Sequence, residues 1–158
     1  MNSIILKAIL ISIIPITELR GGIPFAIAND MNPVLAYFIC VVANILAFPI
    51  VYLFLEFLHP LFSKIDFYKN IYDQFVIKTR KKIDGKIERY GFWGLMIFVM
   101  IPLPITGVYT GSFGAWLLNI PKKKAFLAVV LGVIISGIIV TAVTLSGIEA
   151  FQFLIKNV

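Results

Sequence analysis

Two long apolar stretches constrain this chain more than any other feature of its sequence. Residues 33–58 are apolar apart from Asn44 and Glu56, and residues 122–148 are mostly apolar after a short basic start. At about 1.5 Å per helical residue, each stretch is long enough to cross a hydrocarbon core of roughly 30 Å. Hydrophobic residues make up 60% of the 158 positions and charged residues only 14%, which is more apolar surface than a soluble domain of this size can bury. The sequence therefore predicts an all-α integral membrane protein with a single multi-pass domain, residues 1–158, in the plasma membrane.

The charged residues are clustered, and their sign predicts an orientation. Lys and Arg number 14 against 8 Asp and Glu, and most of the basic residues lie within residues 64–89 or 122–124. Positive charge next to membrane segments marks the cytoplasmic side. We therefore expect residues 59–90 to form a cytoplasmic, amphipathic basic connector, with residues 122–124 on the same face. This pattern is typical of membrane topology and not of nucleic-acid binding, and the single cysteine, Cys40, suggests no metal site or other cofactor.

A short motif occurs twice and divides the chain into two similar units. Residues 15–22 read PITELRGG and residues 104–111 read PITGVYTG, so Pro, Ile, Thr and the last Gly recur at the same spacing. Each motif interrupts an apolar segment and is followed by a further proline and then by one of the long apolar stretches. Because one spanning helix lies between the two motifs, the units would enter the membrane from opposite faces. The sequence thus predicts an inverted repeat.

Each predicted unit is a re-entrant helical hairpin followed by a transmembrane helix. The preference of positive charge for the cytoplasmic side favours re-entrance of the second hairpin. Residues 122–124 at its end then stay on the same face of the membrane as the basic connector. For the first hairpin a broken segment that spans the membrane fits the charges equally well, and only the repeat favours re-entrance. The expected boundaries are hairpin 3–30 and transmembrane helix 33–58, then hairpin 91–121 and transmembrane helix 122–148, with a tail at 149–158.

Proline and glycine are expected to break the helix within both hairpins. Such breaks free backbone N–H and C=O groups, which have to be sheltered from lipid. Paired broken segments in corresponding positions of two halves are the best sequence indication of a transport site near the bilayer midplane. The predicted breaks are Pro15, Gly21, Gly22 and Pro24 in the first hairpin, and Pro102, Pro104, Gly107 and Gly111 in the second.

Glu18 and Arg20 lie in the first break between two apolar runs. Ionisable residues at membrane depth are costly and therefore indicate function. Glu18 could bind and release a proton, and Arg20 could attract an anionic group such as phosphate. The alternative is a structural ion pair that holds the break in shape. The two side chains would lie on one side of an extended segment but diverge by about 200° in a helix.

Uncharged polar side chains complete the predicted substrate- and ion-binding set. The hydroxyl groups of the breaks could orient a substrate, although they could equally cap helices or pair with freed backbone groups. Asn44, in the middle of the first long stretch, could make an interhelical hydrogen bond or line a cavity. The set comprises Thr17 and Asn44 in the first unit and Thr106, Tyr109 and Thr110 in the second.

The sequences around the two breaks resemble those of a known protein family. The segments ELRGGIP (18–24) and PLPITGVYTGSFGA (102–115), together with the hairpin-plus-helix layout, resemble the putative small multidrug export protein family, within or near the DedA superfamily. The resemblance implies two re-entrant hairpins that face each other, and an export function. It matches the acidic residue of the first DedA hairpin to Glu18. The arginines of the second DedA hairpin have no counterpart, since residues 102–114 carry no charge.

These observations favour a transporter over an enzyme. The leading hypothesis is a proton- or ion-coupled carrier that moves a lipophilic or amphipathic solute, with membrane lipids and protons as further partners. The second is a lipid flippase or scramblase for a phospholipid or polyprenyl phosphate. The third, a lipid-pyrophosphate phosphatase, is disfavoured because the breaks hold one acidic residue, no metal-ligand spacing and no nucleophile–base pair. We expect a homodimer, since so small a chain does not easily enclose a cavity alone.

Overall fold

The computed structural model describes residues 2–62, 91–103 and 106–156. Within these ranges the protein contains six helices and no strand, so the predicted all-α class is confirmed. Two of the helices contain stretches long and apolar enough to cross a membrane, Pro33–Leu58 and Lys122–Ile148. In chain order the helices are α1 (Asn2–Ile13), α2 (Glu18–Ala28), α3 (Pro33–Phe62), the helix Gly91–Met100, α6 (Val108–Leu117) and α7 (Lys122–Lys156).

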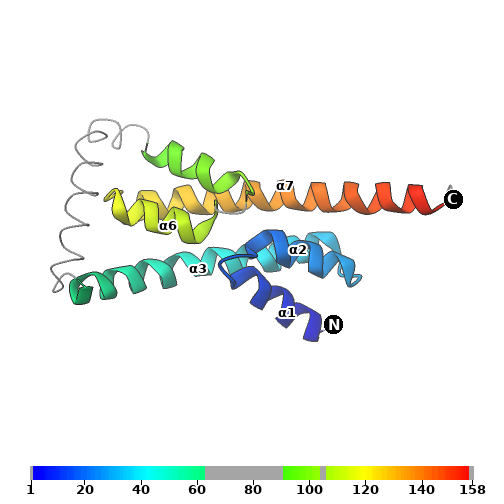
Figure 1. The fold of residues 1–158 in the computed structure, drawn as a ribbon, viewed down its shortest axis with the longest axis horizontal. Coiled ribbons are helices and arrows are strands. Elements are labelled where there is room, and N and C mark those ends of the chain that lie inside the picture. The colour runs from blue at the N-terminus through cyan, green and yellow to red at the C-terminus, as the bar shows by residue number, and fades with distance from the viewer. Residues whose placement is uncertain (1, 63–90, 104–105, 157–158) are drawn as a thin grey trace.

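The four short helices form two hairpins, which lie against the two long helices. α3 and α7 run in opposite directions along the length of the molecule (Figure 1). The hairpin of α1 and α2 extends from one end of this pair, and the hairpin of Gly91–Met100 and α6 extends from the other end. The turns at the tips of the two hairpins therefore meet near the middle of the molecule (Figure 1).

The interruptions of the helices are shorter than the sequence suggested. α2 begins at Glu18 and continues through Gly21, Gly22 and Pro24, so the prediction that these three residues break the helix is wrong. Pro24 removes the hydrogen bond to one carbonyl group, which a helix packed on its neighbours can tolerate. The two glycines serve packing, since a Cβ atom at Gly22 would overlap the Ser12 hydroxyl of α1. In the first hairpin the interruption is confined to residues 14–17 and includes Pro15.

A glycine of the second hairpin also lies inside a helix and not at a break. Gly111 lies inside α6, where a Cβ atom would come within 2.7 Å of Val99, so its predicted role as a break is also wrong. Pro102 and Gly107 do lie in the interruption between Gly91–Met100 and α6. Pro104 falls outside the described residues. The helices thus stop at the turn itself, and glycines beyond the turn bring neighbouring helices close.

Both long helices extend beyond the predicted boundaries. α3 continues past residue 58 to Phe62, and α7 continues to Lys156, so most of the expected tail 149–158 is helical. The remainder of the predicted amphipathic connector, residues 63–90, lies outside the described part of the chain.

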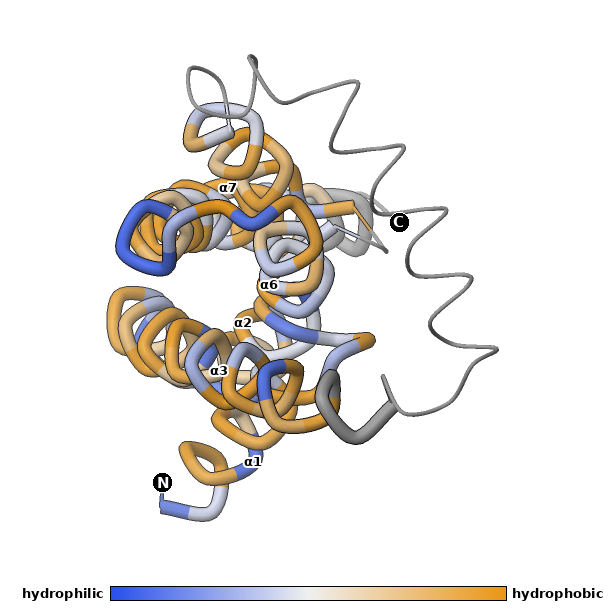
Figure 2. Tube along the Cα trace, turned by 90° about the vertical axis from the view of Figure 1, so that its left-hand side faces the viewer, coloured by the Kyte–Doolittle hydropathy of each residue, from blue (hydrophilic) through white to orange (hydrophobic). Residues whose placement is uncertain are grey.

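Alanine and glycine recur where the helices pack, beside larger buried residues such as Ile23 and Phe48, and many large apolar residues are exposed on the surface. α3 and α7 are hydrophobic along most of their length (Figure 2). Gly137 of α7 lets Tyr37 and Val41 of α3 approach so closely that a Cβ atom there would come within 2.8 Å of both. Such close approach at small residues is typical of helix packing in membranes. Buried alanines include Ala8, Ala26, Ala36, Ala115, Ala125 and Ala128, and exposed apolar residues include Phe38, Leu46, Leu53, Phe57 and Trp93.

An ion pair shows which end of α7 lies beside the end of α3. The Lys122 amine lies 2.6 Å from the Glu56 carboxylate and 5.7 Å from the centre of the Tyr52 ring. Residues 122–124 therefore lie at the end of the molecule where α3 leads into the connector. That residues 59–90 and 122–124 share the cytoplasmic face stays a prediction.

Candidate functional site

The buried carboxylate of Glu18 joins the tips of the two hairpins. Glu18 is the first residue of α2 and only 6% of it is exposed. Its carboxylate accepts hydrogen bonds from the backbone N–H groups of Val108 and Tyr109, the first two residues of α6. Because the first N–H groups of a helix have no partner within it and carry partial positive charge, the Glu18 carboxylate is well suited to this position.

The backbone at both tips is adapted to this contact. Glu18 has a φ of 45°, in the left-handed region that non-glycine residues rarely adopt. Across from it, Gly107 precedes α6 with an extended φ of 169°, which any residue could adopt. What Gly107 provides is space, since a Cβ atom there would overlap the Glu18 carboxylate. A strained residue and a residue without a side chain thus meet at the junction of the hairpins.

The end of α1 is held by donors from two other helices. The Tyr109 hydroxyl of α6 donates a hydrogen bond to the carbonyl of Ile13, the last residue of α1. The amide of Asn44 in α3, which is 1% exposed, donates to the Ser12 carbonyl at 2.9 Å. Asn44 therefore makes the interhelical bond that was one of its two predicted roles. The carbonyls at the end of α1 would otherwise lack partners, because the helix stops there.

The two predicted threonines pair with the backbone of their own hairpins. The Thr17 hydroxyl donates to the Ile11 carbonyl at 2.6 Å, and the Thr106 hydroxyl donates to the Ile101 carbonyl. Thr106 also accepts a hydrogen bond from the Leu103 N–H at 3.1 Å. Both hydroxyls thus stabilise the turns. Thr110 is exposed on α6, and its hydroxyl lies 3.5 Å from the Gly107 carbonyl.

Arg20 differs from the other polar residues of the site. It lies on α2, half-buried and close enough to Glu18 to interact with it electrostatically. Within the described residues Arg20 forms no ion pair with Glu18 and no hydrogen bond. Its guanidinium donors therefore remain available near the tip of the first hairpin.

When the PIT motifs are aligned, the two units show matching local structure. Glu18 corresponds to Gly107, and these two corresponding positions meet at the junction. The turns after α2 and α6 also match, since Asp30 and Asn119 have left-handed φ values of 59° and 56°. After each of them, an N–H bonds to the carbonyl five residues earlier, Met31 to Ala26 and Ile120 to Ala115, at 3.1 and 2.9 Å.

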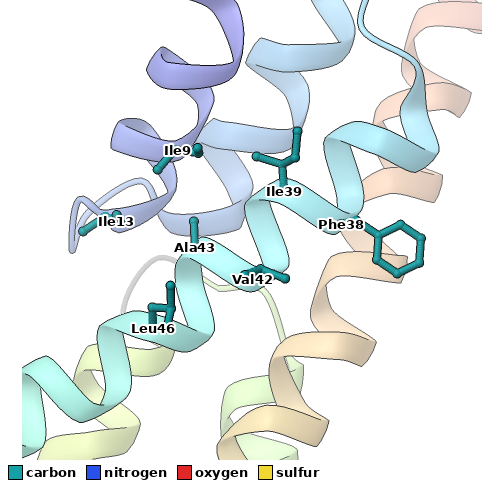
Figure 3. Close-up of a pocket in the computed structure, with 7 residues that line it drawn as sticks. All are labelled: Ile9, Ile13, Phe38, Ile39, Val42, Ala43 and Leu46. Atoms are coloured by element: carbon teal, nitrogen blue, oxygen red, sulfur yellow. The ribbon is translucent and has the colours of Figure 1, made fainter. Parts of the chain in front are cut away.

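Two apolar grooves lie on the sides of the molecule, away from the charged residues. One, of about 370 Å³, lies between α1 and α3 beside Ile13, Phe38 and Ala43 (Figure 3). The other, of about 420 Å³, lies between α3 and α7 beside Tyr37 and Leu145. Neither groove is lined by Glu18 or Arg20. The part of the chain described here has no group of three or more His, Cys, Asp or Glu that could hold a metal ion.

Sequence reasoning found both charged residues of this site but missed the partners of Glu18. The bonds from Val108 and Tyr109 to Glu18, and from Tyr109 to Ile13, join backbone groups to side chains far away in the sequence. Backbone groups leave no signal in a sequence. The one available indication was the alignment of the two motifs, which places Glu18 and Gly107 in corresponding positions.

Comparison with known proteins adds a family assignment. Residues 18–139, well over half of the chain, match the model of a family described as "Putative small multi-drug export protein". The match begins at Glu18, directly after the first turn, and includes the second turn, all of α3 and about the first half of α7. No curated protein and no solved structure shows a significant match. The family description indicates a membrane transporter, in agreement with the two long apolar helices. The chain therefore belongs to the small multidrug export protein family.

Proposed function

We propose that this protein is a proton-coupled transporter that moves an amphipathic solute out of the cell through a site between the tips of its two hairpins. Glu18 binds and releases the coupling proton, and Arg20 attracts an anionic group of the solute. The observation that carries the proposal is the buried Glu18 carboxylate at the junction of the tips. Protonation of this group would weaken its bonds to α6, because a neutral acid is a poorer acceptor for helix N–H groups than a carboxylate. Proton binding would then loosen the contact between the hairpins.

We propose that the hairpins are re-entrant and form an inverted repeat in the plasma membrane, with residues 59–90 and 122–124 in the cytoplasm. Support comes from the lengths of the short helices, which have between 10 and 12 residues and reach roughly half of the hydrocarbon thickness. The hairpins extend from opposite ends of the α3–α7 pair (Figure 1). The matching turns at Asp30 and Asn119 also favour two related units. Alternating access is commonly achieved by movement of one repeat against the other around a central site.

The proposed solute combines an anionic group with an apolar part. Arg20 offers guanidinium donors suited to a carboxylate or phosphate. The groove between α1 and α3 extends to Ile13, near the tip of the first hairpin (Figure 3). Its apolar lining could bind the apolar part of the solute. The word export in the family description supports outward movement.

Reconstitution in liposomes tests the proposal. Purified protein would be assayed with a panel of amphipathic anions and cations, with and without an imposed proton gradient. We expect gradient-dependent flux of anionic amphiphiles, loss of the gradient dependence in Glu18→Gln and at least a tenfold loss of flux in Arg20→Ala. The matched controls are Glu56→Gln and Lys124→Ala, which alter exposed charges far from the tips. Unchanged flux in both site variants would remove the proposed site.

The same assay separates the second candidate, a lipid flippase or scramblase of the DedA type. The lateral apolar grooves favour this function, because both are lined by apolar side chains on the sides of the helices. A scramblase moves labelled phospholipid or polyprenyl phosphate without a gradient. Rapid lipid movement that is independent of the gradient and of Glu18 would therefore support scrambling and contradict proton-coupled export.

We also propose that the working unit is a homodimer. Ile14, Pro15 and Ile16 form the tip of the first hairpin, and Ile16 is 84% exposed. If this hairpin is re-entrant, its tip lies at a depth where irregular backbone is not tolerated in contact with lipid. A second copy would cover it.

A further inference from the structure

Tyr109 contacts both hairpin tips at once. Its hydroxyl donates to the carbonyl of Ile13 at the end of α1, and its backbone N–H donates to the carboxylate of Glu18 at the start of α2. The two contacts lie on opposite sides of the turn that joins α1 and α2. The Tyr109 hydroxyl therefore ties the first turn of α6 to the hairpin that carries Glu18.

We propose that Tyr109 is a positioning residue that sets the pH at which Glu18 binds a proton, because its hydroxyl holds the α6 N–H groups against the carboxylate. The inference rests on the proposed function, in which Glu18 is the proton-binding group. Bonds from the N–H groups of Val108 and Tyr109 stabilise the charged form of Glu18. If α6 moves away, this stabilisation weakens and Glu18 holds its proton up to a higher pH.

Few other groups could set this pH among the residues that the structure describes. Arg20, on the same helix as Glu18, and Tyr109, on α6, are the titratable groups that interact with the carboxylate. α1, α3 and α7 bring no further charged group to the carboxylate in this part of the chain. The Tyr109 hydroxyl donates to the Ile13 carbonyl, so Tyr109→Phe tests how α6 is held in position.

The experiment is an infrared titration of the full-length protein in liposomes, which needs no transported solute. The carboxylic C=O band that disappears in Glu18→Gln belongs to Glu18, and its intensity against pH gives a midpoint. In Tyr109→Phe we expect α6 to shift and this midpoint to rise by about one pH unit, which corresponds to losing one of the two N–H bonds to the carboxylate. The matched control is Tyr37→Phe, which removes a 3.2 Å hydrogen bond from a tyrosine of α3 to the Ile134 carbonyl of α7.

The possible outcomes separate the two proposals. A higher midpoint in Tyr109→Phe with no change in Tyr37→Phe supports the role of Tyr109. An unchanged midpoint, or an equal shift in both variants, overturns it while leaving proton coupling through Glu18 intact. A Glu18 band that does not titrate at any accessible pH overturns both proposals. Thermal unfolding of both variants verifies that each is folded when it is titrated.

Discussion

Gly107 faces Glu18 across the junction of the hairpins, where there is no space for a side chain. Its φ of 169° is open to any residue, yet a Cβ atom would overlap the carboxylate of Glu18. The opposite holds for Glu18, whose φ of 45° is unfavourable for any residue with a side chain. A residue in a sparsely populated backbone region persists only where surrounding contacts fix it, and such residues are concentrated at functional sites. The bonds from α6 are contacts of this kind.

The contact at Gly107 leads to a prediction for Gly107→Ala. The added methyl group should displace the Glu18 carboxylate from the start of α6 and destabilise the protein by about 1–3 kcal/mol, the usual range for overpacking. Thermal or denaturant unfolding in detergent measures the change. Gly114→Ala is the control, because a Cβ atom there meets nothing within 4 Å. A double variant with Glu18→Ala should recover part of the loss, and equal destabilisation in both backgrounds would contradict the proposed clash.

At the scale of the helices, the sequence predicted where the chain is interrupted better than how far the interruption extends. Pro15 of the first PIT motif and Pro102, two residues before the second, both lie at turns, where proline limits hydrogen bonding. Gly21, Gly22 and Gly111 were misread, since a glycine that breaks a helix and a glycine that admits a neighbouring helix look alike in a sequence. The distinction depends on partners such as Ser12 and Val99, which only the tertiary arrangement brings together.

The same limit applies to the candidate site. Glu18 and Arg20 could be selected from the sequence because charge at membrane depth is costly. Whether they pair could not be predicted, since that depended on the contacts at the junction of the hairpins. In the structure Glu18 bonds to the first residues of α6 instead, and within the described residues Arg20 forms no ion pair with it.

The first hairpin also provides a test of the two orientations that its charges allow. α1 and α2 fold back on each other, so residues near 3 and 30 lie at the same end of the molecule (Figure 1). In a Cys40→Ser background, we expect an impermeant thiol reagent to label Ser3→Cys and Asp30→Cys from outside the cell. Asn119→Cys, in the corresponding turn of the second unit, should react only after permeabilisation. Labelling of positions 3 and 30 from opposite faces would mean that this segment spans the membrane.

For the whole molecule, the proposed homodimer is expected to form at the exposed tip of the first hairpin. In a Cys40→Ser background, Ile16→Cys should form crosslinks between copies in native membranes when treated with a short bifunctional thiol reagent. The control is Phe57→Cys, which is also highly exposed (79%) but lies on α3 away from the tip. A monomeric mass in mild detergent, together with equal crosslinking at the two positions, would contradict the dimer.

The lengths of the two long helices have a consequence for the membrane around them. The apolar stretches of α3 and α7 contain 26 and 27 residues, or about 40 Å of helix, which exceeds a typical hydrocarbon thickness of roughly 30 Å. Hydrophobic mismatch of this size is relieved by helix tilt or by local thickening of the bilayer. Both hairpins pack against these helices, so a change in their tilt would move the hairpins as well. The length of the lipid acyl chains would then alter the distance between the hairpin tips.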